Sequence, residues 1–341
     1  MRSPVLRWLR RGVIVLLLFG VLDYLVLPQI AGTRRALHLV STIHPWWAII
    51  GVALETLNFV SYSLLTRSVL LDDRPPYSWL IRTDITALGV SHLVPGGVAT
   101  ASALRFRMLR EGGTPADDAF VGMAVEGVGS TLVLALIFWL ALIASIPIFG
   151  VNPAYATVAV VGAILIAGSL LVIFLRSRLA PTTTTDRSWR IIHRLPHRMQ
   201  PRVERIVQEY SEQLRRLLAD KAGLRASALW AAGSWLMDAA SLWVFVAAYG
   251  HRVDPIGLLV AYGLANLVAI VPISPGGLGV IEGVLIPSLV GFGTPRAIAV
   301  LGVVSWRLFN FWAPIPAAGV CYLSTRTKTW GGGRFFASAR R

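Results

Sequence analysis

Apolar segments long enough to cross a lipid bilayer recur along almost the whole chain, and this feature constrains the fold most strongly. A transmembrane helix needs roughly 20 mostly apolar residues. Segments of about that length or more fall at 13–30, 45–70, 116–148, 154–175, 226–249 and 296–324. Charged residues make up only 14% of the chain, against about 25% in soluble domains. The sequence therefore predicts an all-α integral membrane protein with six full spans.

Two further apolar regions each consist of two short arms around a Pro-Gly-Gly sequence. The arms are 79–93 and 98–109 around Pro95, Gly96 and Gly97, and 257–273 and 278–292 around Pro275, Gly276 and Gly277. Proline removes a backbone donor and paired glycines allow the chain to turn. Each arm is short for a span, and broken backbone is tolerated at membrane depth only where protein or a wet cavity satisfies it. We expect two re-entrant hairpins.

The two hairpin regions match each other when the sequence is shifted by 180 residues. Nine residues between Pro95 and Gly122 are identical to their equivalents between Pro275 and Gly302, including both Pro-Gly-Gly turns and both Gly-Thr-Pro sequences. The spans before and after each hairpin also fall into register. The sequence thus predicts a duplicated unit of span, broken hairpin and span.

Lys and Arg are distributed very unequally between the two sides of the expected membrane. With the N-terminus inside, 27 of the 32 basic residues fall on the inner side and four on the outer side, while Arg307 lies within a span. Basic residues favour cytoplasmic loops, so both termini are expected inside. The two hairpins then enter from opposite faces, which makes the units an inverted repeat of the kind that many secondary transporters use.

This topology gives a single transmembrane domain over residues 1–325. It contains repeat A (45–148), a basic cytoplasmic loop (176–225) and repeat B (226–324), and a basic tail (326–341) that we expect to be disordered follows it. The loop is either an interfacial helix on anionic lipid or a solvated connector between the repeats. Its charge leaves both interpretations open.

Composition excludes several functional classes. The net charge of +15 does not indicate nucleic-acid binding, because the basic residues lie in loops and termini between apolar segments and not on one face of a folded domain. The chain has one cysteine, Cys321, and six dispersed histidines, so no metal site is expected. No motif predicts a cofactor or a catalytic centre, and we expect the protein not to be an enzyme.

Ionisable residues inside the expected spans are the candidate functional residues. Glu55, Glu126, Asp238 and Arg307 fall near the middle of spans, and Glu282 lies on the returning arm of the second hairpin. Such residues cost about 2.5–3.5 kcal/mol each at the bilayer centre and usually mark a substrate path. Their recurrence near the repeat axis predicts a substrate site between the hairpins.

Each candidate has two interpretations. Arg307 is either a cation for a phosphate or carboxylate that crosses the membrane or a structural partner of Glu282 or Glu126. The carboxylates Glu126, Asp238 and Glu282 either carry a proton or accept hydrogen bonds from the opened backbone. Arg105 and Arg107 follow the first hairpin, where a headgroup contact or ordinary positive-inside placement would explain them.

The second repeat resembles a known family. Its Pro-Gly-Gly-Leu-Gly-Val-Ile-Glu sequence over 275–282, the Gly-Thr-Pro at 293–295 and Arg307 look like the lysylphosphatidylglycerol synthase transmembrane-region, or flippase-like, family over about residues 10–325. The first repeat matches more loosely, because Ala99, Thr100 and Ala101 stand where an acidic residue is expected.

The resemblance implies a lipid-handling protein of the cell membrane. Two-domain members carry a soluble aminoacyl-transferase domain, which this chain is expected to lack, and some stand-alone relatives are linked to polyprenyl-phosphate sugar pathways. The leading hypothesis is a translocase for a phospholipid or polyprenyl-phosphate-linked lipid. The expected partners are membrane lipids with anionic headgroups and a lipid-modifying enzyme or glycosyltransferase. Alternatives are a glycosyltransferase with a polyprenyl-phosphate donor, for which the outer loops offer only Asp254, and a non-catalytic scaffold for envelope-lipid enzymes.

Overall fold

The computed structural model describes residues 45–70, 74–94, 97–149, 221–270 and 274–331, and every regular element in these ranges is helical. Four helical stretches are long and apolar enough to span a membrane: Pro45–Val69, Ala116–Ile148, Ala222–Ala248 and Arg296–Arg326. They agree with four of the six predicted spans. The predicted spans 13–30 and 154–175, the loop up to 220, Pro95 and Gly96, and the tail from 332 lie outside the described residues.

The described helices follow the predicted duplication in order and position. Repeat A contains α4 (Pro45–Val69), α5 (Tyr77–Leu93), α6 (Gly97–Glu111) and α7 (Ala116–Phe149). Repeat B contains α11 (Lys221–Ala248), α12 (Pro255–Val268), η2 (Pro275–Gly277), α13 (Val280–Gly291), α14 (Arg296–Arg307), η3 (Leu308–Trp312) and α15 (Pro314–Gly331). A shift of 180 residues places the first residue of α7 on the first residue of α14, so the helix boundaries keep the register of the sequence.

The connectors after the two hairpins have the same local structure. Gly113 and Gly293 both have positive φ angles, of 103° and 89°, which glycine adopts without steric penalty. The backbone N–H groups of Thr114 and Thr294 reach back to the carbonyls of Leu109 and Leu289 at 3.1 and 3.0 Å. Such bonds satisfy carbonyls at a helix C-terminus. The duplicated Gly-Thr-Pro sequence therefore builds the same turn twice.

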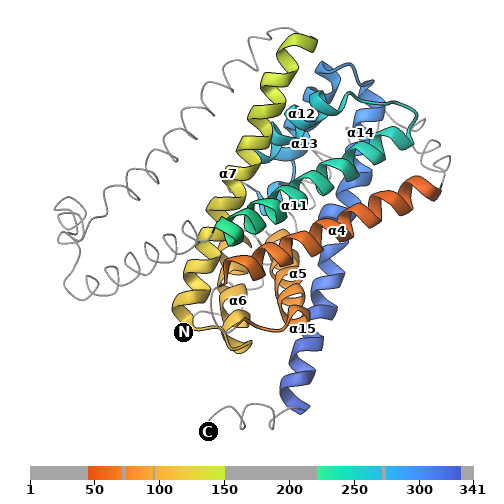
Figure 1. The fold of residues 1–341 in the computed structure, drawn as a ribbon. Helices are drawn as coiled ribbons and strands as arrows, with labels where there is room; N and C mark the ends of the chain where they lie inside the picture. Colours follow the sequence, from red (N-terminus) through yellow and green to blue (C-terminus); the bar gives the residue numbers. More distant parts are fainter. Residues whose placement is uncertain (1–44, 71–73, 95–96, 150–220, 271–273, 332–341) are drawn as a thin grey trace, which may run out of the picture.

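Packing between the repeats is reciprocal. Helices α4 and α11, which are equivalent under the shift, run side by side through the middle of the molecule (Figure 1). The pair α5–α6 lies on one side of them and α12–α13 on the other (Figure 1). Helix α5 packs against α15 at the end of repeat B, while α12 packs against α7 at the end of repeat A. Each hairpin thus rests on the last long helix of the opposite repeat.

The seam between α4 and α11 is built from small residues. The Ser241 hydroxyl donates to the Gly51 carbonyl at 3.1 Å, and a Cβ on Gly51 would lie only 2.5 Å from Cζ of Phe245. Small residues allow the close helix approach that is common inside membranes. The close approach brings polar side chains from the two repeats together at this seam.

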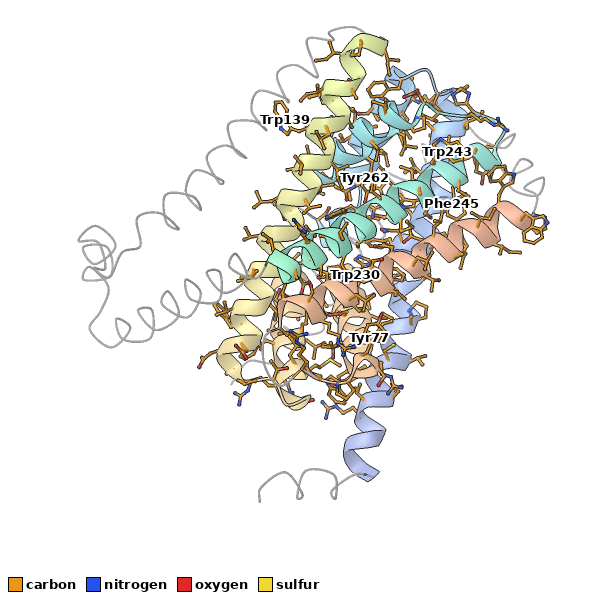
Figure 2. All side chains as sticks on the ribbon, viewed as in Figure 1. Tyr77, Trp139, Trp230, Trp243, Phe245 and Tyr262 are labelled. Carbon is orange, nitrogen blue, oxygen red and sulfur yellow. The ribbon has the colours of Figure 1, made fainter. Side chains whose placement is uncertain are left out.

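Apolar side chains fill the interior of repeat B and cover much of the outside. The interior contains Leu242, Phe245, Tyr262, Leu285 and Trp306, each no more than 2% exposed, and Figure 2 shows Tyr262 in the middle of the bundle. Helix α7 carries Leu136, Leu140 and Ile143 exposed along its outer side. An exposed apolar surface of this kind suits contact with lipid.

Candidate functional site

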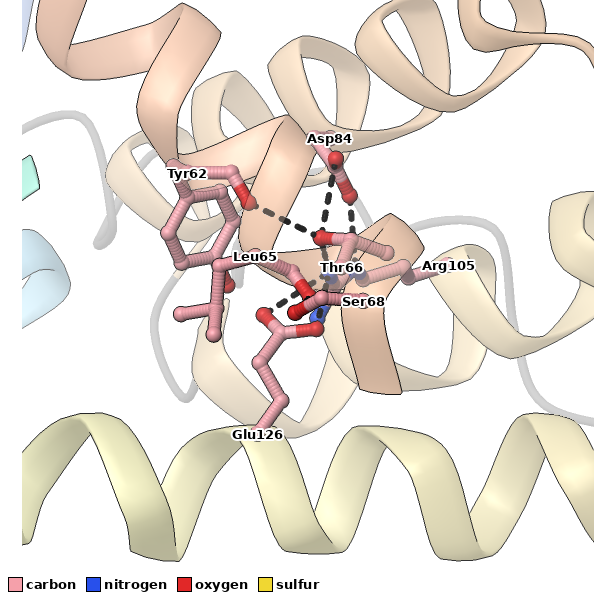
Figure 3. A network of polar contacts seen from close by, with 7 residues as sticks. All are labelled: Tyr62, Leu65, Thr66, Ser68, Asp84, Arg105 and Glu126. Carbon is pink, nitrogen blue, oxygen red and sulfur yellow. Dashed lines mark hydrogen bonds and ion pairs between the residues drawn. The ribbon is translucent and has the colours of Figure 1, made fainter. Parts of the chain in front are cut away.

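The first buried charge site surrounds Arg105 on α6, and we call it the Arg105 cluster. The Arg105 Nε donates to Asp84 of α5 at 2.9 Å, and its Nη2 donates to both oxygens of Glu126 on α7 at 2.8 and 2.9 Å. The same nitrogen donates to the Thr66 hydroxyl of α4 at 2.7 Å. Figure 3 shows the guanidinium enclosed between these groups.

The Arg105 cluster ties the four helices of repeat A together. The side chains of Arg105, Asp84 and Glu126 are 9%, 3% and 2% exposed, and the ring of Tyr62 lies 5.3 Å below the guanidinium carbon. A buried guanidinium needs paired charges and satisfied donors. Here two carboxylates surround one cation, which leaves little room for a further anion.

The second site surrounds Arg307 at the end of α14, and we call it the Arg307 site. The Arg307 Nε donates to Glu282 of α13 at 2.5 Å, and Nη2 donates to the Gly277 carbonyl at 3.3 Å. The guanidinium carbon lies 5.3 Å from the Trp306 ring and 5.4 Å from the Phe311 ring. One carboxylate, one long hydrogen bond and two aromatic rings therefore hold this cation.

Breaks in the backbone put these groups in place. In the second Pro-Gly-Gly turn, Gly276 and Gly277 have φ angles of 54° and 71°, conformations that suit glycine. Helix α13 then begins, and the Glu282 carboxylate accepts the Gly279 N–H at 2.6 Å, one of the donors left free at a helix start. Glu282 therefore links the start of α13 to Arg307.

The second Pro-Gly-Gly turn also contacts the first hairpin region, near the C-terminal end of α5. The turn packs against α5 and α6, and a Cβ on Gly276 would lie 2.5 Å from Phe311 and 2.6 Å from His92. The His92 ring stacks on Phe311 at 4.3 Å, and its Nδ1 is 2.9 Å from the Phe311 carbonyl. Phe311 lies in η3, a π-helical segment of the kind often found at functional sites.

A third polar site lies around Asp238 on α11. Its Oδ1 accepts from Trp306 Nε1 at 2.7 Å and from Asn310 Nδ2 at 3.0 Å, and its Oδ2 accepts from the Tyr262 hydroxyl at 2.6 Å. Asp238 thus binds α12, α14 and η3. Glu55 of α4 is 2% exposed. It faces Asp238 across the α4–α11 seam, between the bonds of Ser241 to Gly51 and of Ser234 to Asn58.

The structure groups the candidate residues in a way that the sequence left open. Arg307 pairs with Glu282, while Glu126 pairs with Arg105. Arg107 joins neither site, because it is exposed and pairs with Glu111 on its own helix. Sequence reasoning missed Asp84 as the partner of Arg105, although an acidic residue on the apolar first arm was a usable indication. In the described part of the chain, no group of His, Cys, Asp and Glu is arranged to hold a metal ion.

The two repeats exchange the positions of their charges. In repeat A the arginine is on the second hairpin arm and a carboxylate is on the long helix that follows; in repeat B the carboxylate Glu282 is on the arm and Arg307 is on the helix. The helix boundaries keep the 180-residue register, but the ion pair is not copied residue by residue.

This fold and these buried charges define a helical, multi-spanning membrane protein. The family model for the lysylphosphatidylglycerol synthase transmembrane region matches residues 9–318, and the chain belongs to this family. It is 22% identical over 321 residues to a UPF0104 membrane protein of Methanothermobacter thermautotrophicus, covering 90% of this chain and 93% of the relative. A UPF0104 membrane protein of Pyrococcus horikoshii is 27% identical over 120 residues, which cover 35% and 36% of the two chains.

Proposed function

We propose that this protein is a lipid translocase of the cell membrane, which moves a phospholipid or a polyprenyl-phosphate-linked lipid between leaflets without chemical change. The headgroup passes between the two hairpins while the acyl chains stay in the bilayer. In this proposal the orientation is the one that the basic residues predict, with inverted repeats whose hairpins open toward opposite faces in turn.

The Arg307 site is the observation that carries this proposal. A guanidinium offers five N–H donors. Within the described residues, Arg307 donates two hydrogen bonds, one to Glu282 and one to the Gly277 carbonyl at 3.3 Å. A bond of that length is weak, so a phosphate oxygen can replace the Gly277 carbonyl. Arginine is well suited to bind phosphate with paired donors.

The neighbours of Arg307 favour a mobile binding site. Its side chain is only 6% exposed, so a headgroup reaches it when the second hairpin moves. Glu282 connects Arg307 to the first residues of α13, and the glycine-rich turn before α13 supplies backbone freedom. Phosphate binding at Arg307 would weaken its bond to Glu282 and release the hairpin.

The family description points to the same substrate class. The family takes its name from lysylphosphatidylglycerol synthase, which names a phospholipid headgroup. For this chain the shared chemistry is a phosphate group on a lipid. We assign phosphate recognition to Arg307 and a structural role to the Arg105 cluster, because the cluster already supplies two carboxylates to one cation.

Reconstitution into proteoliposomes tests the proposal. Lipids with a fluorescent acyl chain and a native headgroup are placed in the inner leaflet, and a membrane-impermeant reductant reports their arrival outside. Phosphatidylglycerol, phosphatidylethanolamine and a polyprenyl phosphate serve as separate substrates. The protein should accelerate at least one of them over empty vesicles. An unchanged rate for all three classes would reject the translocase.

A variant pair tests the role of Arg307. Arg307→Gln should slow translocation by about 10- to 100-fold, the equivalent of one charge-assisted hydrogen bond of about 1.5–3 kcal/mol. Arg296→Gln is the matched control, because Arg296 is exposed on the same helix. Equal rates for Arg307→Gln and the wild type would remove the phosphate-binding role.

A further inference from the structure

Two acidic side chains from different repeats meet inside the α4–α11 seam. Glu55 comes from repeat A and Asp238 from repeat B, and they are 2% and 6% exposed. Across the seam the Ser241 hydroxyl bonds to the Gly51 carbonyl and the Ser234 hydroxyl bonds to Asn58. These two bonds bracket Glu55 and Asp238 and place them opposite each other, close enough for their carboxyl groups to interact. Helices α4 and α11 are equivalent under the 180-residue shift and pack along each other, so the two acidic side chains lie at the interface between the two repeats.

The hydrogen bonds around the pair are unequal. Asp238 accepts three bonds, from Tyr262, Trp306 and Asn310, and such bonds stabilise a carboxylate. Glu55 accepts one, from Asn58 Nδ2 to Oε2 at 3.1 Å. Its Oε1 is buried and has no hydrogen-bond partner in the described part of the chain. Of the two acidic side chains, Glu55 is therefore the one with a buried carboxyl oxygen that lacks a hydrogen-bond partner among the described residues.

The surrounding charged groups do not neutralise Glu55. Arg307 of α14 lies near Tyr262 but is paired with Glu282 of α13. The carboxylates Asp84 of α5 and Glu126 of α7 are both paired with Arg105. On α11, Ser234 and Ser241 contribute neutral hydroxyls. The Ser234 hydroxyl donates to Asn58 Oδ1 at 2.6 Å, and the Ser241 hydroxyl, which donates to the Gly51 carbonyl at 3.1 Å, also lies near the Glu55 carboxyl.

Two ionised carboxylates in contact repel strongly where little water can screen them. Two carboxylate groups also have no hydrogen to share, because each offers only acceptors. A single bound proton removes the repulsion between the two carboxylates and supplies the hydrogen for a bond between them. If it resides on Glu55, its O–H can donate to Asp238, which keeps its other three donors.

We propose that Glu55 and Asp238 form a proton-binding site at the seam between the repeats, with the proton carried on Glu55 and shared with Asp238. The proton enters from water on one face and leaves to water on the other. When it is bound, the seam closes; when it is lost, two negative charges remain in contact and drive α4 and α11 apart. Coupling of this proton to lipid movement rests on the proposed translocase function, whereas the site itself does not.

Infrared difference spectroscopy of the purified protein in lipid tests the site directly. A buried, protonated carboxylic acid gives a carbonyl band that ionised carboxylates lack. At neutral pH the wild type should show this band, and isotopically labelled glutamate should shift it, which assigns it to Glu and not to Asp. Glu55→Gln should abolish it. Asp117→Asn, at an exposed position on α7, should leave it unchanged.

The results separate the site from its coupling. A glutamate band that disappears in Glu55→Gln supports the site even if no lipid is moved, and in that case only the proposed function fails. The absence of a glutamate band at neutral pH, or its survival in Glu55→Gln, overturns the site. If Glu55→Gln does not fold, the isotope shift in the wild type decides.

The coupling is tested in the same vesicles as translocation. A pH gradient across the membrane should change the wild-type lipid rate several-fold, and Glu55→Gln should remove this dependence because an amide does not titrate in this range. If the wild-type rate of lipid translocation is the same with and without the pH gradient, the proposed coupling is wrong.

Discussion

The two halves of the molecule each bury one arginine, but they surround it differently. Arg105 is held by two carboxylates and a hydroxyl from three other helices, whereas Arg307 has one carboxylate, one long bond to a backbone carbonyl and two aromatic rings. The first arrangement locks four helices of repeat A together. The second sits beside a glycine turn with positive φ angles, so the two repeats hold their buried arginines in different ways.

The largest expected effect is on stability at the Arg105 cluster. Arg105→Met leaves Asp84 and Glu126 buried without their cation, which should lower the free energy of unfolding by about 3–5 kcal/mol. Arg307→Met should cost less, about 1–3 kcal/mol, because Glu282 keeps its hydrogen bond from the Gly279 N–H. Denaturant titration in detergent micelles measures both, with Arg110→Gln on the exposed side of α6 as control. A larger loss for Arg307→Met would reverse the comparison.

A compensated variant sharpens the same point. Arg105→Met combined with Asp84→Asn and Glu126→Gln removes all three charges, and it should recover most of the lost stability because no uncompensated charge stays buried. If the triple variant is as unstable as Arg105→Met alone, the loss does not come from the stranded carboxylates.

The second Pro-Gly-Gly turn gives an effect of intermediate size. Gly276→Ala should destabilise by about 1–3 kcal/mol, because φ is 54° and the new Cβ would lie 2.5 Å from the Phe311 ring. Gly283→Ala on α13 is the control: its Cβ meets nothing within 4 Å, and alanine favours a helix. Thermal unfolding followed by tryptophan fluorescence compares them. Equal midpoints would show that the turn tolerates a side chain.

The smallest expected effect tests whether the two turns that follow the hairpins, at Gly113 and Gly293, are structurally equivalent. Gly113→Ala and Gly293→Ala should each cost about 1–2 kcal/mol, since both glycines have positive φ and a Cβ would meet nothing within 4 Å in either case. The same unfolding measurement should give equal shifts. A clear difference between the two would contradict the structural equivalence of the connectors.

Helix positions and connectors could be predicted because their causes are local. The long apolar segments predict the positions of α4, α7 and α11, and the glycines and prolines predict where helices end. The expected start of the span at 226 was five residues later than the helix, which begins at Lys221. The π-helical segment had a local cause as well, since Pro314 and Pro316 lack the N–H groups that would bond to the preceding turn.

The partners of the charged residues could not be predicted in the same way. The pairing of Arg105 with Asp84 and Glu126, and of Glu55 with Asp238, depends on how four or more helices rotate and cross. Hydrophobic periodicity is weak when both lipid and protein faces are apolar, so the sequence does not show which side of a helix points inward.

Lipid translocation by two neutralised variants tests the central claim most directly. One variant carries Arg307→Met with Glu282→Gln, and the other carries the three charge-removing changes of the Arg105 cluster. Both are reconstituted at equal density and compared with the wild type. The account predicts that the first loses translocation and the second retains most of it. Loss in the cluster variant with full activity in the Arg307 variant would contradict the account.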